Sequence, residues 1–160
     1  MRRAEVDVDA ALWTIPAART KNGRAHTVPL SVAALEIVKA RLLKADDGRD
    51  APLFAHVGAP MPSNAIAHSA RLKLQLFEDP WTPHDIRRTV ATMMADSGTL
   101  PHVIEAVLNH ISGFRAGVAG TYNRNAYDRE KRQALDMWAD RLDAIVAGRA
   151  SNVTPMRRPA

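Results

Sequence analysis

Apolar and polar positions alternate along residues 11–15 and again along residues 25–29. A two-residue period is typical of strands that bury one face. Between the two stretches, the step Asn22-Gly23 favours a tight turn. The pattern therefore predicts an antiparallel β-hairpin with Lys21 near its tip.

Beyond the hairpin, apolar residues recur every three or four positions, which is the spacing of helices with one buried face. A first helix is predicted after Ser31, which is a good N-cap. Its inward positions would be Val32, Leu35, Val38 and Leu42, and its outward positions Glu36, Lys39 and Arg41. A second helix is predicted over residues 63–76.

Three more helices are predicted in the second half of the chain. Thr82 and Pro83 form a good helix start, with Asp85 in the first turn, and Gly98 ends that helix. Its buried stripe would be Ile86, Val90 and Met94. A short helix opens at Pro101 and turns Ile104, Val107 and Leu108 inward. The last runs from about residue 127 to residue 146 and repeats Leu135, Trp138, Leu142 and Ile145.

The remaining segments complete the expected fold. Residues 52–55 are apolar and fit either a third strand beside the hairpin or a buried loop. Residues 111–120 carry three glycines and are expected to be a loop, and the tail beyond Gly148 is expected to be disordered. The fold class that follows is mainly α with a small antiparallel β-sheet (α+β).

The composition fits one folded domain, and it indicates what kind of partner the domain binds. With 160 residues, of which 46% are apolar and 24% charged, the chain can form one core, and we expect a single domain over residues 1–148 followed by a basic tail, 149–160. The net charge of +5 and a pI near 10.1 suit a phosphate-rich partner, although a charge of this size also serves solubility. The chain has no cysteine, which excludes disulfides, zinc fingers and thiol catalysis. It has no signal peptide and no apolar run of the roughly 20 residues that span a bilayer, so a cytoplasmic location is expected.

Five polar residues form a set with chemical meaning: Lys21, His84, Arg87, His110 and Tyr122. A nucleophile, two histidines that can carry protons and two permanent cations are sufficient to break and rejoin a phosphodiester without a metal or another cofactor. His84 and Arg87 are three positions apart and project from one helix face. Taken singly, each residue also has a common structural role, as a cap, a turn residue or a packing residue, so only the complete set indicates this chemistry.

The order and spacing of these residues resemble the catalytic domain of the tyrosine recombinases, the phage integrase family. The resemblance is carried by residues 20–31 at the β-turn lysine, 82–89 at the His-x-x-Arg box, 108–110 at the second histidine and 120–127 at the nucleophile. The resemblance covers about residues 4–147. The chain is most similar to the prophage integrases whose tyrosine is followed by Asn-Arg.

The resemblance implies a role for each residue of the set. Tyr122 would attack the scissile phosphate and form a 3′-phosphotyrosyl intermediate, so that strands are rejoined without ATP. Lys21 would protonate the leaving 5′ oxygen, Arg87 and His110 would hold the phosphate oxygens, and His84 would handle the tyrosine proton. Further contacts with DNA phosphates are expected from Arg24, Arg88, Arg115 and Arg124. The partners implied are double-stranded DNA and other integrase protomers on DNA.

Three positions depart from the family pattern or leave a choice open. Tyr127 is a rival nucleophile, and Tyr122 is preferred because it follows the glycine-rich segment, whereas Tyr127 opens a long amphipathic helix. Asn109 stands where the family usually has glycine. The run Arg2-Arg3-Ala4-Glu5 mimics the Arg-x-x-Glu box that holds the first catalytic arginine of the family, but its spacing identifies residues 1–9 as the approach to the first strand. The chain is therefore expected to be a C-terminal part that lacks the first helices of the domain, and to cleave DNA poorly alone.

Other readings remain open at this point. A non-catalytic helical DNA-binding module would use Arg87, Arg88, Arg115 and Arg124 only as phosphate clamps. A type IB topoisomerase would share much of the chemistry, but the Asn-Arg after the tyrosine favours an integrase. A metal hydrolase built on His84, His102 and His110 is disfavoured, because the chain has no His-Glu-x-x-His or carboxylate-rich box.

Overall fold

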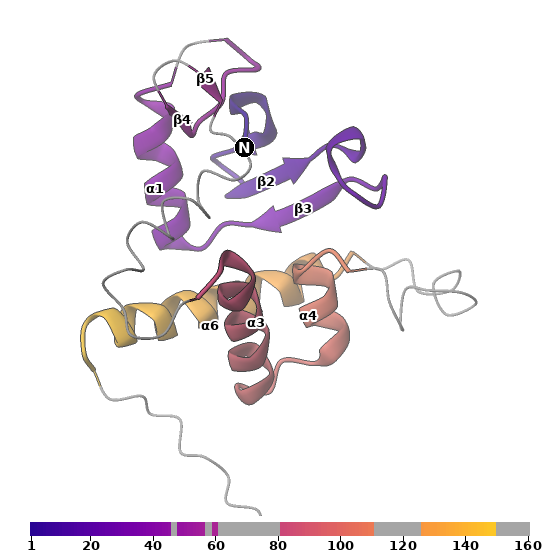
Figure 1. Ribbon diagram of the computed structural model, residues 1–160, viewed down its shortest axis with the longest axis vertical. Coiled ribbons are helices and arrows are strands. Elements are labelled where there is room, and N and C mark those ends of the chain that lie inside the picture. The colour runs from indigo at the N-terminus through magenta and orange to yellow at the C-terminus, as the bar shows by residue number, and fades with distance from the viewer. Residues whose placement is uncertain (46–47, 57–58, 61–80, 111–125, 150–160) are drawn as a thin grey trace, which may run out of the picture.

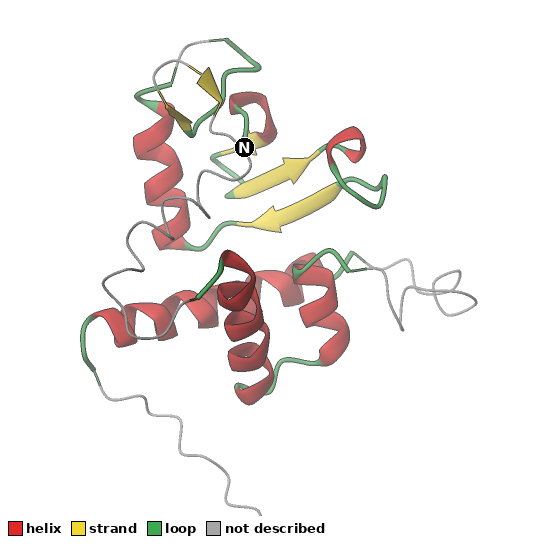
Figure 2. Cartoon of the chain, viewed as in Figure 1, coloured by secondary structure: helices red, strands yellow, loops and turns green. Residues whose placement is uncertain are grey.

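The structure, a computed structural model, describes residues 1–45, 48–56, 59–60, 81–110 and 126–149. The strands and the first helix lie on one side of the molecule, and the helices from the second half of the chain lie on the other (Figures 1 and 2). Helices and a small antiparallel sheet together make an α+β fold, which confirms the fold class expected from the sequence. The expected helix over 63–76, the loop over 111–120 and the tail from 150 onward lie outside the described residues.

The sheet side begins with a single 3₁₀ turn, η1 (Arg3–Glu5), which leads into β1 (Val6–Asp7). Strand β2 (Leu12–Ile15) pairs antiparallel with β1 and with β3 (His26–Pro29), in the order β1-β2-β3. Helix α1 (Val32–Leu42) follows, capped by the Ser31 hydroxyl, which accepts a hydrogen bond from the backbone N–H of Ala34. A separate two-stranded sheet consists of β4 (Ala55–His56) and β5 (Ala59–Pro60).

The helical side consists of α3 (Pro83–Asp96), α4 (Pro101–Val107) and α6 (Asp128–Val146). Helix α3 starts with a capping box: the Thr82 hydroxyl accepts from the backbone N–H of Asp85, and the Asp85 carboxylate accepts from the backbone N–H of Thr82. These bonds satisfy N–H groups that have no partner inside the helix. They fix the first turn of α3, which carries His84.

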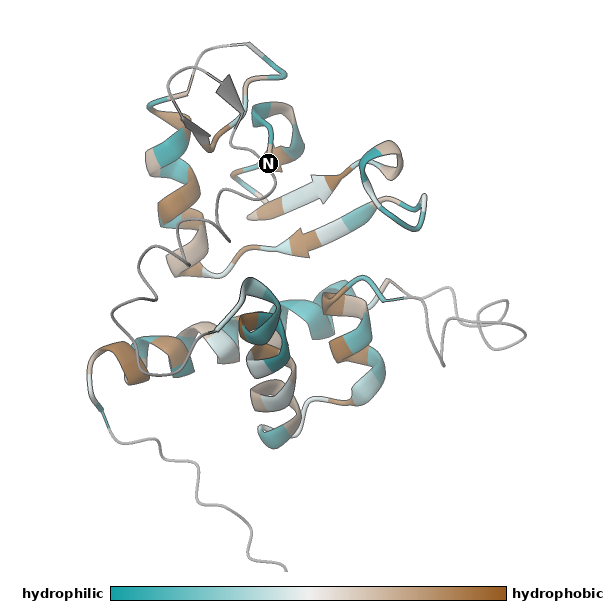
Figure 3. Ribbon diagram, in the orientation of Figure 1, coloured by the Kyte–Doolittle hydropathy of each residue, from teal (hydrophilic) through white to brown (hydrophobic). Residues whose placement is uncertain are grey.

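Two apolar clusters match the two sides. Leu30, Val38 and Leu53 are buried between the sheet, α1 and the segment before β4. Met94, Val103, Ile104 and Ala134 are buried where α3, α4 and α6 meet. In Figure 3 these helices show apolar and polar segments in alternation, as expected for helices that bury one face.

Helix α6 joins the two sides through two cationic side chains. Lys131 is only 4% exposed, and its Nζ donates to the Thr27 carbonyl on β3 at 2.7 Å and pairs with Asp128 at 2.8 Å. Arg132 donates from Nη2 to the carbonyls of Ala10, at 2.9 Å, and Ala11, at 3.3 Å. A buried ammonium is costly unless it is paired and hydrogen-bonded. Lys131 is both, so α6 is held on the hairpin by directional bonds as well as by apolar packing.

Most sequence predictions for the elements are confirmed, with their caps at Ser31 and Thr82 and with Gly98 in the left-handed conformation (φ +85°) just after α3. The hairpin is present, but a short 3₁₀ turn, η2 (Ala17–Arg19), lengthens its connection beyond a tight two-residue turn. Residues 52–55 do not join the main sheet. Leu53 is buried in a loop, which is one of the two predicted alternatives, and β4 starts only at Ala55.

Four predicted core positions are wrong, and two of them lie toward the end of α6, where Leu142 is 43% and Ile145 50% exposed. Val32 is 76% exposed, because it lies roughly 100° around the helix axis from the arc of α1 that packs on the sheet. Ile86 is 48% exposed, because α3 packs against α4 and α6 through Val90, Ala91 and Met94, beyond its first turns. The three- and four-residue spacing identified all three helices, but it could not tell which turns of each helix a neighbour covers.

A buried carboxylate organises the N-terminal end of the sheet. Glu5 is 9% exposed and accepts hydrogen bonds from the Trp13 indole at 3.1 Å, from the Arg2 backbone N–H at 2.9 Å, and from the Arg19 guanidinium. Burial by itself raises the pKa of the Glu5 carboxyl, but the hydrogen bonds and the Arg19 charge outweigh burial, and the pKa lies below its ordinary value of 4.5.

We expect Glu5→Gln to destabilise the chain by about 1–3 kcal/mol at pH 7, because a hydrogen-bonded charge is lost. A carboxyl whose pKa is lower in the folded state than in the unfolded state stabilises the fold fully at pH values above its unfolded pKa. This stabilisation is lost as the pH falls through the folded pKa. The difference between wild type and variant in urea unfolding should therefore be largest above pH 4.5 and shrink below it. An equal difference at pH 7 and pH 3 would contradict this role for the Glu5 charge.

Candidate functional site

The turn that follows α4 is the centre of the candidate site. The N–H of His110 donates to the Glu105 carbonyl at 2.9 Å, and the N–H of Asn109 donates to the Ala106 carbonyl at 3.3 Å. Together with φ +54° at Asn109, these bonds form a Schellman motif, in which one left-handed residue ends the helix. Glycine adopts that conformation most easily and asparagine tolerates it. Asn109 therefore fits a position where glycine was expected, and His110 follows as an exposed residue.

Helix α3 contributes Arg87 to this turn. Arg87 is partly buried, and its guanidinium Nη2 donates to the Leu108 carbonyl. Carbonyls at a helix C-terminus lack partners within the helix and carry the negative end of its dipole, so a guanidinium is well placed there. The contact fixes Arg87 beside the turn that carries His110 and leaves its other N–H groups available for a phosphate.

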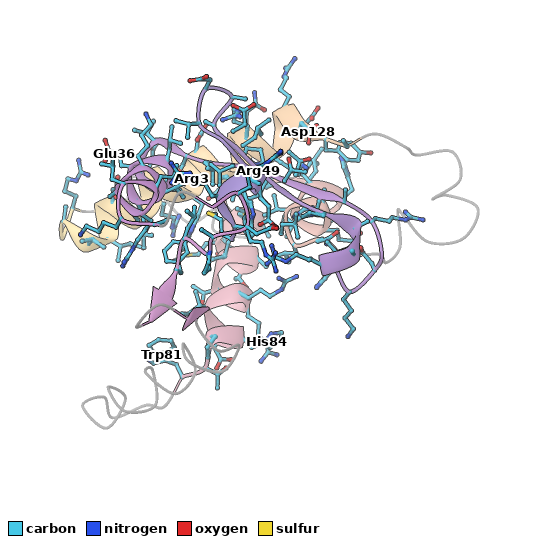
Figure 4. The ribbon with its side chains drawn as sticks, turned by 90° about the horizontal axis from the view of Figure 1, so that it is seen from above. Arg3, Glu36, Arg49, Trp81, His84 and Asp128 are labelled. Atoms are coloured by element: carbon cyan, nitrogen blue, oxygen red, sulfur yellow. The ribbon has the colours of Figure 1, made fainter. Side chains whose placement is uncertain are left out.

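His84 lies one turn before Arg87 and is exposed. Figure 4 shows its side chain at the N-terminal end of α3, near Trp81. The same turn carries Asp85, whose hydrogen bonds from Thr82 hold the pKa of its carboxyl below its ordinary value, so it stays ionised at neutral pH. Arg88 lies 3.8 Å from Asp85 and is 75% exposed, so its charge remains accessible to a ligand.

The hairpin connection contributes Lys21, which is exposed. Its neighbour Asn22 donates from Nδ2 to the Asn109 side-chain oxygen at 2.9 Å and to the Asn109 carbonyl at 3.3 Å. Residues 87 positions apart in the sequence are thus in direct contact. In Figure 1 the loop between β2 and β3 extends toward the end of the molecule where α4 lies.

The structure therefore brings together three of the five predicted catalytic residues or their immediate neighbours. Arg87 contacts Leu108, Asn22 beside Lys21 contacts Asn109, and His110 is the next residue in the chain. His84 belongs to the helix that supplies Arg87. The Arg87 guanidinium is the cationic group that the structure fixes at this turn, and a guanidinium there can bind a phosphodiester and stabilise the negative charge that develops on its oxygens during displacement.

Tyr122, the predicted nucleophile, lies outside the described residues, as do Arg115 and Arg124. The described chain stops at His110 and resumes at Ala126, and both of these ends lie close to α4. His110 follows α4 directly, and Tyr127 packs on His102 of α4 with ring centroids 4.9 Å apart. His110 and Tyr127, the described residues on either side of this gap, thus both lie beside the helix whose end forms the candidate site.

Tyr127, the alternative nucleophile, packs against α4. Tyr127 is partly buried, has φ +53° as the residue before α6, and stacks at an interplanar angle of 48° on His102. His102 is in this way engaged in packing, and among the residues that the structure describes His84, His102 and His110 form no metal-binding cluster. These contacts agree with the packing role that the sequence suggested for Tyr127.

The N-terminal Arg-x-x-Glu run is engaged away from the candidate site. Arg2 pairs with Asp50 at 3.0 Å, and Arg3 donates to the Leu42 carbonyl at the end of α1 at 2.9 Å. Glu5 is bonded to Trp13 and Arg19, as described above. Figure 4 shows Arg3 well separated from His84. Residues 1–9 are more than the predicted approach to the first strand, because they contain η1 and β1, and β1 pairs with β2 as the edge of the sheet.

Comparison with known proteins identifies the family. Residues 1–129 match the Phage integrase family. The chain belongs to the phage integrase family. The chain is 34% identical to prophage integrase IntA of Escherichia coli K12 over 144 residues, which cover 90% of the chain and 34% of IntA. It is 30% identical to prophage integrase IntZ of the same strain over 151 residues, 94% of the chain and 36% of IntZ.

A third relative is the integrase of Shigella phage Sf6, with 27% identity over 149 residues, 91% of the chain and 37% of that protein. The chain spans about a third of the length of these relatives. No solved structure matches it. In the part of the chain that the structure describes, none of the helices has the length and apolar character needed to cross a bilayer.

Sequence reasoning missed two residues that shape the site. Asn22 was read only as half of a turn signal, yet it forms the contact between the hairpin and Asn109. No role was predicted for Lys131, yet it is buried and its ammonium is bonded to β3. The sequence does hold a signal for the burial of Lys131. The residue lies four positions before Leu135 and therefore on the apolar side of an otherwise polar first turn.

Proposed function

We propose that this chain carries the catalytic centre of a site-specific DNA strand transferase that acts through a tyrosine nucleophile, without a metal or ATP. The observation that supports the proposal most strongly is the convergence on one turn, Leu108 to His110, of three of the four segments that carry the family resemblance. Core packing brings α3 against α4, and the Asn22 contact with Asn109 adds the hairpin loop to the same turn.

The proposed chemistry is an in-line displacement at phosphorus. The Tyr122 oxygen forms a bond to phosphorus, the bond from phosphorus to the 5′ oxygen breaks, and a 3′-phosphotyrosyl link results. A phenol with a pKa near 10 is a poor nucleophile at neutral pH, so its proton must pass to a base, for which His84 is the candidate. Lys21 supplies a proton to the departing 5′ oxygen, and Arg87 and His110 hold the non-bridging oxygens.

DNA is the proposed partner, contacted also by Arg24, Arg88, Arg115 and Arg124, together with other integrase protomers assembled on the same DNA. Arg24 and Arg88 are exposed and lie on the two elements that carry Lys21 and Arg87. We place the protein in the bacterial cytoplasm and treat residues 1–148 as one catalytic domain followed by a basic tail.

We expect slow cleavage by the chain in isolation. Arg2 and Arg3, the residues that mimic the first arginine box, are bound to Asp50 and to the end of α1. A phosphoryl-transfer site that works with one phosphate-binding group fewer typically loses on the order of 10²-fold or more in rate. Long incubations with a trapping substrate are therefore the appropriate assay.

The experiment that tests the proposal is covalent capture on a nicked duplex, in which the cleaved end diffuses away and prevents rejoining. We expect a protein–DNA adduct that survives denaturing electrophoresis and forms equally in the presence of a chelator. A complex that is sensitive to salt and is lost on denaturation would instead support the alternative of a non-catalytic DNA-binding module.

A further inference from the structure

Asn22 and Asn109 connect the loop between β2 and β3 with the turn after α4, two segments that are far apart in the sequence. The Asn22 amide nitrogen bonds to both oxygens of Asn109, at 2.9 Å and 3.3 Å. On its other side, the Asn22 Oδ1 accepts a hydrogen bond from the backbone N–H of Arg24 at 3.1 Å. Because a backbone N–H can only donate, this bond sets the orientation of the amide and directs the NH₂ group of Asn22 toward Asn109.

The loop that carries Lys21 is held within itself by bonds close to its base. The Thr20 hydroxyl bonds to the carbonyls of Ala17 at 2.9 Å and Arg24 at 2.7 Å. These bonds shape the loop, but they do not place it relative to the helices. The Asn22 bonds to Asn109 do so, because Asn109 belongs to the turn after α4.

Asn109 contributes more than a tolerated replacement for glycine. Its positive φ of +54° is the conformation that glycine adopts most easily, yet glycine has no side-chain acceptor for Asn22. The Asn109 side chain adds the shorter of the two bonds that Asn22 makes. Asparagine therefore serves both the turn and the contact with the loop.

We propose that Asn22 and Asn109 form a clamp that holds the Lys21 loop on the turn carrying His110, and that Asn22 is thereby a positioning residue for Lys21. This inference rests on the proposed function, in which Lys21 donates a proton to the leaving 5′ oxygen. A lysine on a long, flexible side chain is effective as an acid only when its backbone is held at a fixed distance from the reacting phosphate.

Hydrogen exchange on the free chain tests the clamp without any need for activity. Asn22→Asp keeps the acceptor for Arg24 but replaces the donor with an oxygen that faces the Asn109 oxygens. Asn109→Asp is the matched control, because aspartate tolerates the turn and still accepts from Asn22. We expect amides of residues 20–24 to exchange about five- to tenfold faster in Asn22→Asp and to change little in Asn109→Asp. Unchanged exchange in Asn22→Asp would overturn the clamp.

Cleavage kinetics test the positioning role. Asn22→Ala and Lys21→Ala are compared with wild type on an ordinary nicked duplex and on one in which sulfur replaces the leaving 5′ oxygen. A thiolate, whose conjugate acid has a pKa of about 8.5, leaves without a proton donor. We expect Asn22→Ala to be about tenfold slower on the ordinary substrate and within about twofold of wild type on the sulfur substrate, as for an impaired acid.

Equal slowing of Asn22→Ala on both substrates would overturn the positioning role, because a general structural defect does not depend on the leaving group. If the wild-type chain forms no adduct with either substrate, the proposed strand transfer fails for this chain. The exchange experiment still decides whether the clamp exists, so the two failures are distinguishable.

Discussion

Replacing Tyr122 with phenylalanine is expected to abolish the covalent protein–DNA adduct completely. The substitution removes one oxygen, and without that oxygen no phosphotyrosyl bond can form. Non-covalent binding to DNA should be nearly unchanged, because the Arg87 guanidinium keeps its bond to the Leu108 carbonyl and the loop that carries Lys21 keeps its contact with Asn109. The measurement is the adduct yield on a nicked duplex after denaturing electrophoresis, together with the salt dependence of binding.

Tyr127→Phe is the matched control within the same chain. Tyr127 packs its ring on His102, and phenylalanine retains the ring, so the contact at the start of α6 should survive. We expect the adduct yield of this variant to stay within about twofold of wild type, since the phenylalanine ring fills the same space. Loss of the adduct in Tyr127→Phe with retention in Tyr122→Phe would reverse the assignment of the nucleophile.

Arg87→Ala is expected to reduce the rate of cleavage at saturating DNA by about 10²- to 10³-fold. The guanidinium has two functions in our account, because it donates to the Leu108 carbonyl and presents its remaining N–H groups to the phosphate. Arg87→Lys keeps the charge but loses the planar fork, and we expect it to recover only part of the rate. Single-turnover cleavage at several DNA concentrations separates the chemical step from binding.

Arg88→Ala provides the comparison for Arg87. Arg88 lies on the same helix but is 75% exposed and pairs with Asp85 instead of contacting the turn. We expect its loss to weaken DNA binding and to reduce the salt dependence of binding by the contribution of about one phosphate contact, with a much smaller effect on cleavage at saturation. If the two variants slow cleavage at saturating DNA by the same factor, Arg87 has no special role in the reaction.

Local rules predicted the helix starts of this chain well. Thr82, Pro83 and Asp85 occur in the order that a capped helix requires, and the structure has the capping box there. Ser31 caps α1 for the same reason. Both predictions succeed because the bonds concerned join residues only three positions apart, so the sequence alone contains both partners.

Long-range contacts could not be read in the same way. Asn22 and Asn109 are 87 positions apart, and Lys131 reaches Thr27 across 104 positions. Nothing in the local pattern around either residue indicates its partner. The site itself was predicted as a set of residue types in a given order, and the structure adds the physical reason that three of its segments meet, which is the turn after α4.

The most direct test of the account is to identify the residue that becomes attached to DNA. Trypsin cleaves after Arg115, Arg124 and Arg129, so the two tyrosines fall in separate peptides, residues 116–124 with Tyr122 and residues 125–129 with Tyr127. After covalent capture, nuclease digestion and trypsin, we expect a nucleotide mass on the peptide 116–124 alone. A nucleotide on the peptide 125–129, or on neither peptide despite a stable adduct, would contradict it.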